Sequence, residues 1–384
     1  MRERVYLDWN ATAPLCPEAR QAMAAAWDLL GNPSSVHAEG RQARRLVEDA
    51  RAAVATAVGG QPRNVVFTSG GTEANALALT PGLRGGSGQA LHSLFVSAIE
   101  HPSVLSGGRF LPEFVSRIGV TRFGLVDLDQ LERALASREP ALVSIMAANN
   151  ETGALQPLRE AAEIVHKMGG LLHVDAVQAF GKIEFNINDI GADLVTLSAH
   201  KIGGPKGIGA LVLADGVQGL DPLLRGGGQE RGHRAGTENV AGIAGFGAAL
   251  KAALDRLEDT VGRLEQLRAQ LEDGLRRSPE VAIFSDDAPR LPNTTLFTVP
   301  GLRAETAVIG FDLAGVAVSS GSACSSGKVQ SSHVLEAMGF SRSQAQGAVR
   351  ISLGWSTSEA DIDYCLQAWR KLANTLLREQ RNTA

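Results

Sequence analysis

The sequence predicts an α/β protein with a mainly parallel sheet covered by helices on both faces, followed by a smaller α+β unit. Short apolar runs alternate with segments whose apolar residues recur at helical spacing, and this alternation is typical of a parallel sheet. The chain has 384 residues, too many for one simple core but suitable for two packed domains. The runs that predict strands are 65–67, 94–96, 142–145, 171–174, 194–197 and 210–213.

A long helical pattern marks the change from the first unit to the second. Leu264, Leu267 and Leu271 share one face of the segment 261–275, and we expect the second domain to start near this helix. After it, 294–297 and 350–353 are strand-like and alternate with helical patterns to the end of the sequence.

The composition excludes several classes of function. A net charge of −4 is unlike the basic surface of a nucleic-acid-binding protein. No stretch is apolar enough to span a bilayer, and no signal region follows the first residues, so we expect a cytoplasmic protein without a membrane partner. The three cysteines are odd in number and lack C-x-x-C spacing, so we expect neither disulfides nor a metal site.

Polar side chains follow five of the predicted strands. Because open α/β sheets bind ligands at the carboxyl ends of their strands, this recurrence predicts a binding site there. The clusters are Thr68–Glu73, Glu100–His101, Asn149–Glu151, Asp175–Gln178 and Ser198–Lys201.

Each cluster has an ordinary structural interpretation beside the functional one. The turn 69–72 can hold an anion on free N–H groups, or be a plain turn capped by Thr72. Asp175 can cap a helix or pair with a pyridinium nitrogen. Lys201 can be a solvated surface lysine or form a Schiff base, and His101 can be a core histidine or stack on a flat ring.

The cysteines differ in their surroundings. Cys324 lies in the Ser/Gly-rich run 319–327, which favours a reactive thiol over an incidental cysteine in a linker. Cys365 falls on an apolar helical face and is expected to pack in a core, whereas Cys16 gives no signal.

Ordered motifs run through nearly the whole chain, at 6–12, 31–35 with His37, 68–73, 100–102, 149–153, 175–178, 200–201, 226–231, 234–239 and 320–324. In number and order they resemble the cysteine desulfurases of the class V aminotransferase group, in the branch that supplies iron–sulfur cluster assembly and includes the nitrogen-fixation type. The resemblance implies a pyridoxal-phosphate-dependent transferase fold, with a mainly parallel seven-stranded sheet in a large domain. That domain would span 16–254, and 1–15 with 255–384 would form the small domain that carries the Cys324 loop.

The resemblance also implies an activity and partners. L-cysteine would be converted to L-alanine, and its sulfur would pass to Cys324 as a persulfide for delivery to a scaffold protein of iron–sulfur cluster assembly. Cys324 could then ligate a cluster transiently. The active enzyme would be a homodimer, and the sequence leaves open whether its role is housekeeping or dedicated to nitrogen fixation.

The resemblance assigns roles to individual residues. Lys201 would carry the cofactor and remove the substrate's α-proton, Asp175 would pair with the pyridine nitrogen, Gln178 would bond the phenolic oxygen, and His101 would stack on the ring and exchange protons. The phosphate would be held by Gly71, Thr72, Ser198 and His200, with Thr237 reaching the phosphate of the other subunit. Asn150 would contact cofactor and substrate, and with Arg350 would hold the substrate carboxylate.

Two positions depart from the family's pattern. Trp9 stands where a second Asn is usual, and Asn75 stands where an acidic residue is common; we expect neither to touch the residues just named. The alternatives are a selenocysteine lyase of the same fold, another class V enzyme such as an aminotransferase, and a catalytically idle partner subunit.

Overall fold

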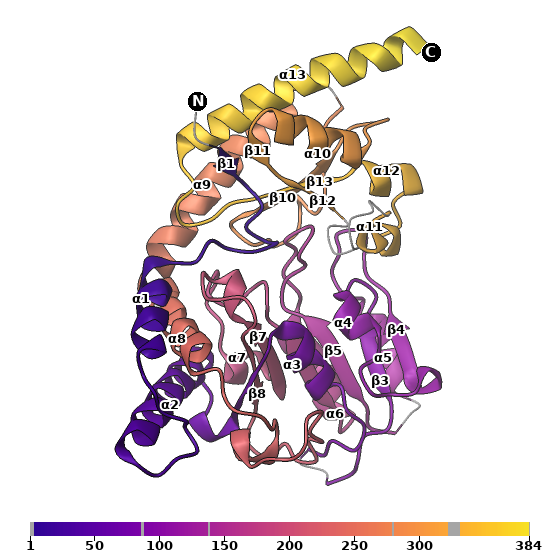
Figure 1. Ribbon diagram of the computed structural model, residues 1–384. Helices are drawn as coiled ribbons and strands as arrows, with labels where there is room; N and C mark the ends of the chain where they lie inside the picture. Colours follow the sequence, from indigo (N-terminus) through magenta and orange to yellow (C-terminus); the bar gives the residue numbers. More distant parts are fainter. Residues whose placement is uncertain (1–3, 86–87, 137–138, 279, 322–330, 384) are drawn as a thin grey trace.

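The protein has two unequal halves, each built on its own sheet (Figure 1). The computed structural model describes residues 4–85, 88–136, 139–278, 280–321 and 331–383. The larger half contains a seven-stranded sheet and the smaller half a four-stranded sheet, as predicted for an α/β domain followed by an α+β unit.

The large sheet runs in the order β2-β8-β7-β6-β5-β3-β4, and only β8 is reversed. All six runs predicted from the sequence form its strands. The edge strand β4 was not predicted, because its residues are mostly half-buried or exposed and form no apolar run. The strands are β2 (Val65–Thr68), β3 (Leu94–Ser97), β4 (Val115–Ile118), β5 (Leu142–Met146), β6 (Leu171–Asp175), β7 (Leu194–Ser198) and β8 (Gly209–Leu213).

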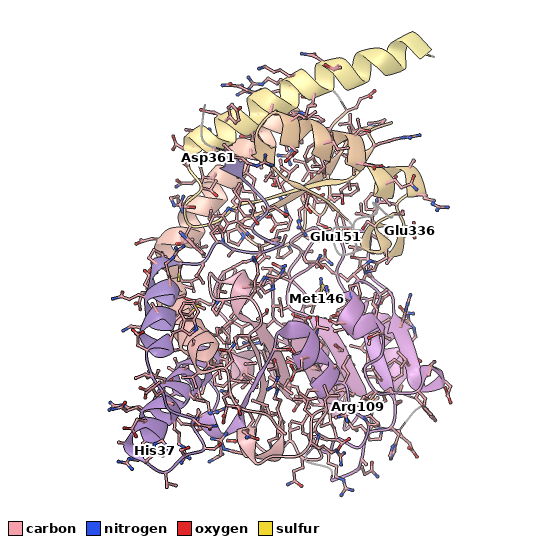
Figure 2. All side chains as sticks on the ribbon, in the orientation of Figure 1. His37, Arg109, Met146, Glu151, Glu336 and Asp361 are labelled. Carbon is pink, nitrogen blue, oxygen red and sulfur yellow. The ribbon has the colours of Figure 1, made fainter. Side chains whose placement is uncertain are left out.

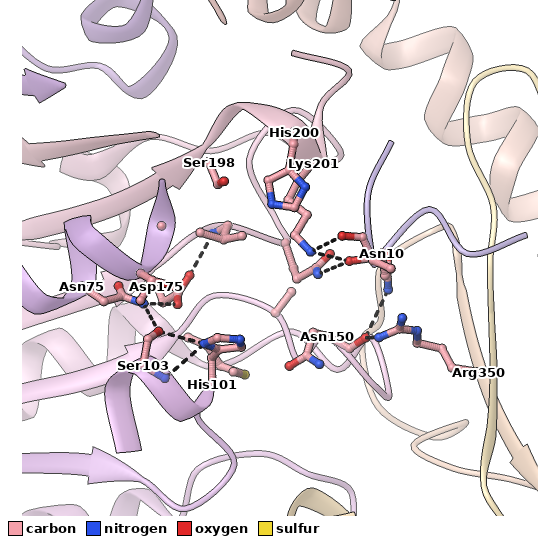
Figure 3. Close-up of a pocket in the computed structure, with 17 residues that line it drawn as sticks. Asn10, Asn75, His101, Ser103, Asn150, Asp175, Ser198, His200, Lys201 and Arg350 are labelled. Carbon is pink, nitrogen blue, oxygen red and sulfur yellow. Dashed lines mark hydrogen bonds between the residues drawn. The ribbon is translucent and has the colours of Figure 1, made fainter. Parts of the chain in front are cut away.

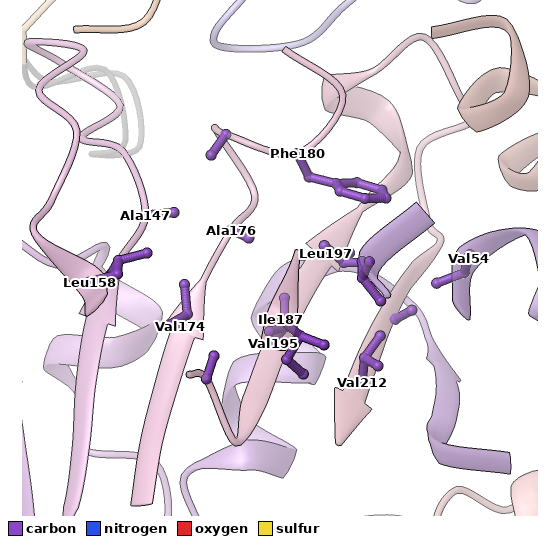
Figure 4. Close-up of a cluster of buried hydrophobic side chains, with 14 of the residues drawn as sticks. Val54, Ala147, Leu158, Val174, Ala176, Phe180, Ile187, Val195, Leu197 and Val212 are labelled. Atoms are coloured by element: carbon purple, nitrogen blue, oxygen red, sulfur yellow. The ribbon is translucent and has the colours of Figure 1, made fainter. Parts of the chain in front are cut away.

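Neighbouring residues of each large-sheet strand pack into different cores, because successive side chains point to opposite faces. On β7, Val195 and Leu197 join one apolar cluster with Val54 and Ile187 (Figure 4), whereas Leu194 joins the cluster on the other face. Helices cover both faces. They are α1 (Pro17–Trp27), α2 (Ala38–Val58), α3 (Gly71–Ala78), α4 (Pro102–Leu105), α5 (Leu128–Leu135), α6 (Leu158–Lys167), α7 (Ile187–Ile190) and α8 (Val240–Asp255).

The smaller half packs three helices on a mainly antiparallel sheet of order β12-β13-β10-β9. Its core contains Trp369, Phe297 and Cys365, so the prediction that Cys365 packs in a core is confirmed. The strands are β9 (Ala282–Ile283), β10 (Thr294–Thr298), β12 (Ser319–Ser320) and β13 (Val349–Ser352), and the helices are α9 (Leu257–Arg276), α10 (Ala304–Leu313) and α13 (Glu359–Thr383).

The two halves meet at the level where Figure 2 labels Met146 and Glu151. A separate apolar cluster spans this junction, joining Ile99 and Met146 of the large half to Leu296 and Ala348 of the small half. It includes residues of α11 (His333–Ala337) and α12 (Arg342–Gly347). The N-terminal strand β1 (Val5–Tyr6) pairs with β11 (Val316–Ala317), so the first residues attach to the small half. None of the helices in the described part of the chain is long and apolar enough to cross a membrane.

Candidate active site

A cavity of about 290 Å³ lies where the carboxyl ends of β2, β3, β5, β6 and β7 meet the small half. The five strands run in the same direction, so the polar clusters that follow them converge as predicted. The predicted site residues in its lining are Gly71, Thr72, His101, Asn150, Asp175, Gln178, Ser198, His200, Lys201 and Arg350.

One wall of the cavity, which we call the carboxylate wall, consists of Asp175, Asn75, Ser103 and His101 (Figure 3). The Asn75 amide donates one hydrogen bond to Asp175 Oδ2, at 2.8 Å, and another to Ser103 Oγ, at 2.9 Å. Ser103 Oγ in turn lies 2.8 Å from His101 Nδ1. The second oxygen of Asp175 accepts the backbone N–H of Val177, so both carboxylate oxygens are fixed within the large half.

The opposite side, which we call the cation wall, consists of Lys201, Asn10 and Arg350 in the lining, together with Lys182, which bonds Asn10 from outside the lining. Lys201 follows β7 in a short 3₁₀ turn, and its Nζ donates to the carbonyl oxygens of Asn10 and Ala11 at 2.6 and 2.9 Å. Lys182 Nζ donates to Asn10 Oδ1 at 2.9 Å and to Gln178 Oε1 at 2.7 Å. Neutral oxygens thus accept these hydrogen bonds from two ammonium groups.

Arg350 brings the small half into the cation wall. It lies on β13, is 2% exposed, and donates to Asp8 Oδ1 at 2.8 Å and to the carbonyl oxygen of Asn150 at 2.9 Å. Its Nε–H is buried and has no partner among the described residues. Because a buried unpaired donor costs about 1–3 kcal/mol, the cavity favours a ligand with an acceptor for it.

The turn between β2 and α3 forms the floor of the cavity. Gly70 has a φ of +155°, in the region that favours glycine. At Gly71, a Cβ would lie 2.9 Å from the Val177 side chain, so the backbone comes close to the strand-end loop. The first hydrogen bond of α3 runs from Ala74 to Gly70, which leaves the N–H groups of Gly71 and Thr72 without acceptors inside the helix. Free N–H groups at a helix start suit an anion.

Buried groups in or beside the two walls have pKa values shifted toward their neutral forms. Burial, and then the Asp175 carboxylate, raise the pKa of Glu100 well above its usual value. On the other side, desolvation followed by Lys201 and Arg350 lowers the pKa of Lys182. Desolvation, with nearby lysines including Lys201, also lowers the pKa of His200 to about 4, so this imidazole is neutral at pH 7.

Two predicted residues are not placed in the cavity. Thr237 is exposed and does not contribute to the lining, so within one chain it is separate from the other site residues. Cys324 lies outside the described residues. The residues on either side of its segment lie near the cavity: Ser319 pairs with Arg350, and Ser332 Oγ donates to Glu151 Oε2 at 2.5 Å.

Four residues of the walls were missed or misjudged from the sequence. Asn10, Lys182 and Ser103 carried no assignment, although Asn10 lies in a recognised motif. The expectation that Asn75 touches none of the named residues was wrong, because its amide bonds Asp175 directly. The sequence signal that could have identified Asn75 is that it is the polar residue on the otherwise apolar buried face of α3. Trp9 packs edge-on against Trp355 at 4.6 Å between ring centroids.

Comparison with known proteins agrees with this geometry. The profile of the class V aminotransferases matches residues 5–365. The cysteine desulfurase of Cereibacter sphaeroides is 43% identical over 97% of this chain and 97% of its own length. The cysteine desulfurase IscS of Dictyoglomus turgidum is 39% identical over 98% of this chain and 96% of its own. Among solved structures, a NifS-like protein from Rickettsia africae is 39% identical, with a TM-score of 0.88 over 97% of this chain and all of that chain. The chain therefore belongs to the class V aminotransferase family, in its pyridoxal-phosphate-dependent cysteine desulfurase group.

Proposed function

We propose that this enzyme converts L-cysteine to L-alanine and transfers the sulfur to Cys324. The observation that carries the proposal is that Asp175 and Lys201 line opposite sides of one cavity. The floor of this cavity is a glycine turn that suits an anion. Arg350, with its unpaired Nε, adds a site for a carboxylate at the junction with the small half.

The residues present fit pyridoxal phosphate. A side chain at Gly71 would collide with Val177, so at this position only the backbone faces the cavity. Gly71, Thr72, Ser198 and neutral His200 would hold the phosphate. Asp175 would accept from the pyridine nitrogen, since its carboxylate is already fixed by Asn75 and Val177. Gln178 would bond the phenolic oxygen with one amide N–H, because Lys182 occupies its Oε1 and the Asn10 carbonyl oxygen accepts its other N–H. His101 would stack on the ring, and Asn150 would contact it.

The bound cofactor supplies an electron sink for the negative charge left when the substrate's α-proton is removed. Lys201 Nζ is the base that takes this proton, and His101 supplies or accepts the further protons. Arg350 and Asn150 orient the substrate by its carboxylate. For Arg350 this requires the guanidinium to share its donors between Asp8 and the substrate.

Sulfur transfer is balanced without an added oxidant or reductant. The thiolate sulfur of Cys324 bonds the substrate sulfur, the carbon–sulfur bond of cysteine breaks, and a proton takes its place on carbon. L-cysteine and the Cys324 thiol thus give L-alanine and a Cys324 persulfide. Cys324 is three residues beyond Gly321, whose N–H donates to Ala348 in the strand-end region next to Arg350. This connection supports delivery of the thiol to the substrate.

The proposal extends to the assembly and its partners. Thr237 is exposed in one chain, as a residue that reaches the phosphate of a second subunit would be, and a homodimer would provide that subunit. The sulfur acceptor would be a scaffold of iron–sulfur cluster assembly, in a housekeeping or nitrogen-fixation role, with possible cluster ligation by Cys324 itself. Cys16 and Cys365 are free thiols, which fits the reducing cytoplasm. The domain limits 16–254, 1–15 and 255–384 remain part of the proposal.

Cys324→Ser tests the function. A serine hydroxyl is close in size to a thiol but far less nucleophilic at neutral pH, so we expect normal cofactor colour and loss of both persulfide and alanine formation from cysteine. The assay measures alanine, with mass spectrometry of the peptide that contains residue 324. Cys16→Ser is the matched control and should keep full activity. Undiminished alanine in the Cys324→Ser variant, with no sulfur found on Cys324 in the wild type, would favour a different class V activity; alanine formed from selenocysteine alone would favour the lyase.

A further inference from the structure

The hydrogen bonds of the carboxylate wall connect His101 to Asp175 through two side chains. The backbone N–H of Ser103 donates to His101 Nδ1 at 3.2 Å, and this contact caps α4. An imidazole nitrogen that accepts an N–H carries no proton, so Nδ1 is unprotonated and the proton of neutral His101 is on Nε2.

The Ser103 hydroxyl supports the same tautomer. Its oxygen accepts one N–H of the Asn75 amide, so its own proton is free to be donated to His101 Nδ1. The orientation of Asn75 follows from Asp175, because a flipped amide would place its oxygen against the carboxylate oxygen 2.8 Å away. The directions of all these bonds are therefore fixed by the Asp175 carboxylate and the Ser103 backbone.

We propose that Asn75 and Ser103 are positioning residues, which hold the His101 proton on Nε2 and fix Asp175 Oδ2 as an acceptor. Nε2 is then the ring nitrogen that remains to exchange a proton with a bound substrate. The inference deepens the proposed function, on which it rests for the reaction that His101 serves, but the hydrogen bonds themselves do not depend on it.

The surroundings of His101 agree with a neutral ring. Removal from solvent lowers the pKa of His101, whereas Asp175 raises it and Lys201 and His333 lower it. Glu100, the preceding residue, is buried with a raised pKa, and its Oε1 accepts the N–H of Met146. An acid at position 75, as is common in the family, would bring a second carboxylate against Asp175 and accept the Ser103 proton.

The test measures the tautomer and pKa of His101 in the full-length protein with ¹⁵N-labelled histidine, both free of cofactor and loaded. The wild type should show protonated Nε2. Asn75→Asp should raise the pKa of His101 by about one unit, because it adds a nearby negative charge. Ser103→Ala should raise it by about half a unit through loss of one donor to the neutral ring. In the loaded protein, Asn75→Asp should also displace the pH midpoint of the cofactor's visible absorbance.

Two further variants separate positioning from general structural effects. Ser103→Thr keeps the hydroxyl and should restore the wild-type pKa. Ser106→Ala removes an exposed hydroxyl at the C-cap of the same short helix, which among the described residues donates to the Ser103 carbonyl oxygen, and should change nothing. A wild-type His101 protonated on Nδ1, or the same pKa in folded Ser103→Ala as in the wild type, would overturn the proposal. These signals need no cysteine or sulfur transfer, so they can fail or succeed independently of the Cys324 test.

Discussion

The two walls of the cavity are built in different ways. The carboxylate wall is complete within the large half: its side chains bond one another, and the Asp175 carboxylate and the Ser103 backbone N–H fix the directions of these bonds. The cation wall draws on four separate parts of the chain: the N-terminal segment with Asn10, the segment after β6 with Lys182, the loop after β7 with Lys201, and β13 with Arg350. Its ammonium groups are held by neutral oxygens. One wall is thus organised to hold a cation, and the other retains positive charge for anions.

This contrast explains why both walls shift pKa values against charge. Each wall concentrates one sign and removes it from solvent, so Glu100 resists ionisation and Lys182 and His200 resist protonation. A ligand with a cationic ring nitrogen and anionic phosphate and carboxylate groups would compensate the negative charge of one wall and the positive charge of the other.

Among substitutions in the cation wall, we expect Lys201→Ala to have the largest effect on activity. Activity should fall by more than about a thousandfold, because the variant lacks the amine that we propose carries the cofactor and takes the α-proton. Borohydride reduction followed by peptide mapping should find no cofactor on the peptide that contains position 201. Retained turnover or covalent cofactor there would contradict the assignment of the base.

Arg350→Gln removes the contribution of the small half to the cation wall. We expect kcat/KM for L-cysteine to fall by about a hundredfold, which corresponds to about 2–3 kcal/mol for a charge-assisted bond to a carboxylate. Cofactor affinity should change little. Steady-state kinetics and a cofactor titration measure the two effects, and Arg303→Gln is the control, an arginine of the small half outside the cavity. Equal kinetics in both variants would show that Arg350 only holds Asp8 and the Asn150 backbone and does not bind the substrate.

Glu151→Gln tests a buried acid whose charge would interact with Arg350 of the cation wall. Burial raises the pKa of Glu151 to about 7. A raised folded-state pKa stabilises the protein fully below the unfolded value near 4.5, and this contribution is lost as the pH rises through 7. Relative to wild type, the variant should therefore gain about 2–3 kcal/mol in unfolding free energy between pH 4.5 and 8. Urea unfolding of the cofactor-free protein at both pH values measures this; a gain that does not depend on pH would be inconsistent with a buried acid.

Lys182→Met tests the buried amine of the cation wall. Loss of its hydrogen bonds to Asn10 and Gln178 should weaken cofactor binding about tenfold. Fluorescence titration of the cofactor-free protein measures the affinity. The control is Lys206→Met, an exposed lysine near His200 that does not line the cavity. If both variants bind the cofactor equally, the hydrogen bonds of Lys182 do not contribute to cofactor affinity.

The sequence predicted two of the four residues of each wall, Asp175 and His101 in one and Lys201 and Arg350 in the other. Asp175 and His101 each follow an apolar strand, so their convergence at one edge follows from strand direction alone. Asn10 lies 168 positions from Gln178, to which it is hydrogen-bonded, and no local pattern reports such a contact. Asn75 was misjudged for a similar reason, because its partner Asp175 is 100 positions away. Motif resemblance identified residue types, whereas the hydrogen-bond directions required the packed structure.

The reversed strand β8 has a consequence for synthesis of the chain. β2 pairs only with β8 in the large sheet, and Val65 is opposite Val212. The strand β2, which leads into the glycine turn, therefore has no partner in the sheet until residues 147 positions later have been synthesised. At translation rates of about 5–20 residues per second this takes on the order of 10–30 s. During that interval β2 is an unpaired apolar segment of a nascent chain, and the glycine turn after it gains its strand partner only after β3, β5, β6 and β7 have been synthesised.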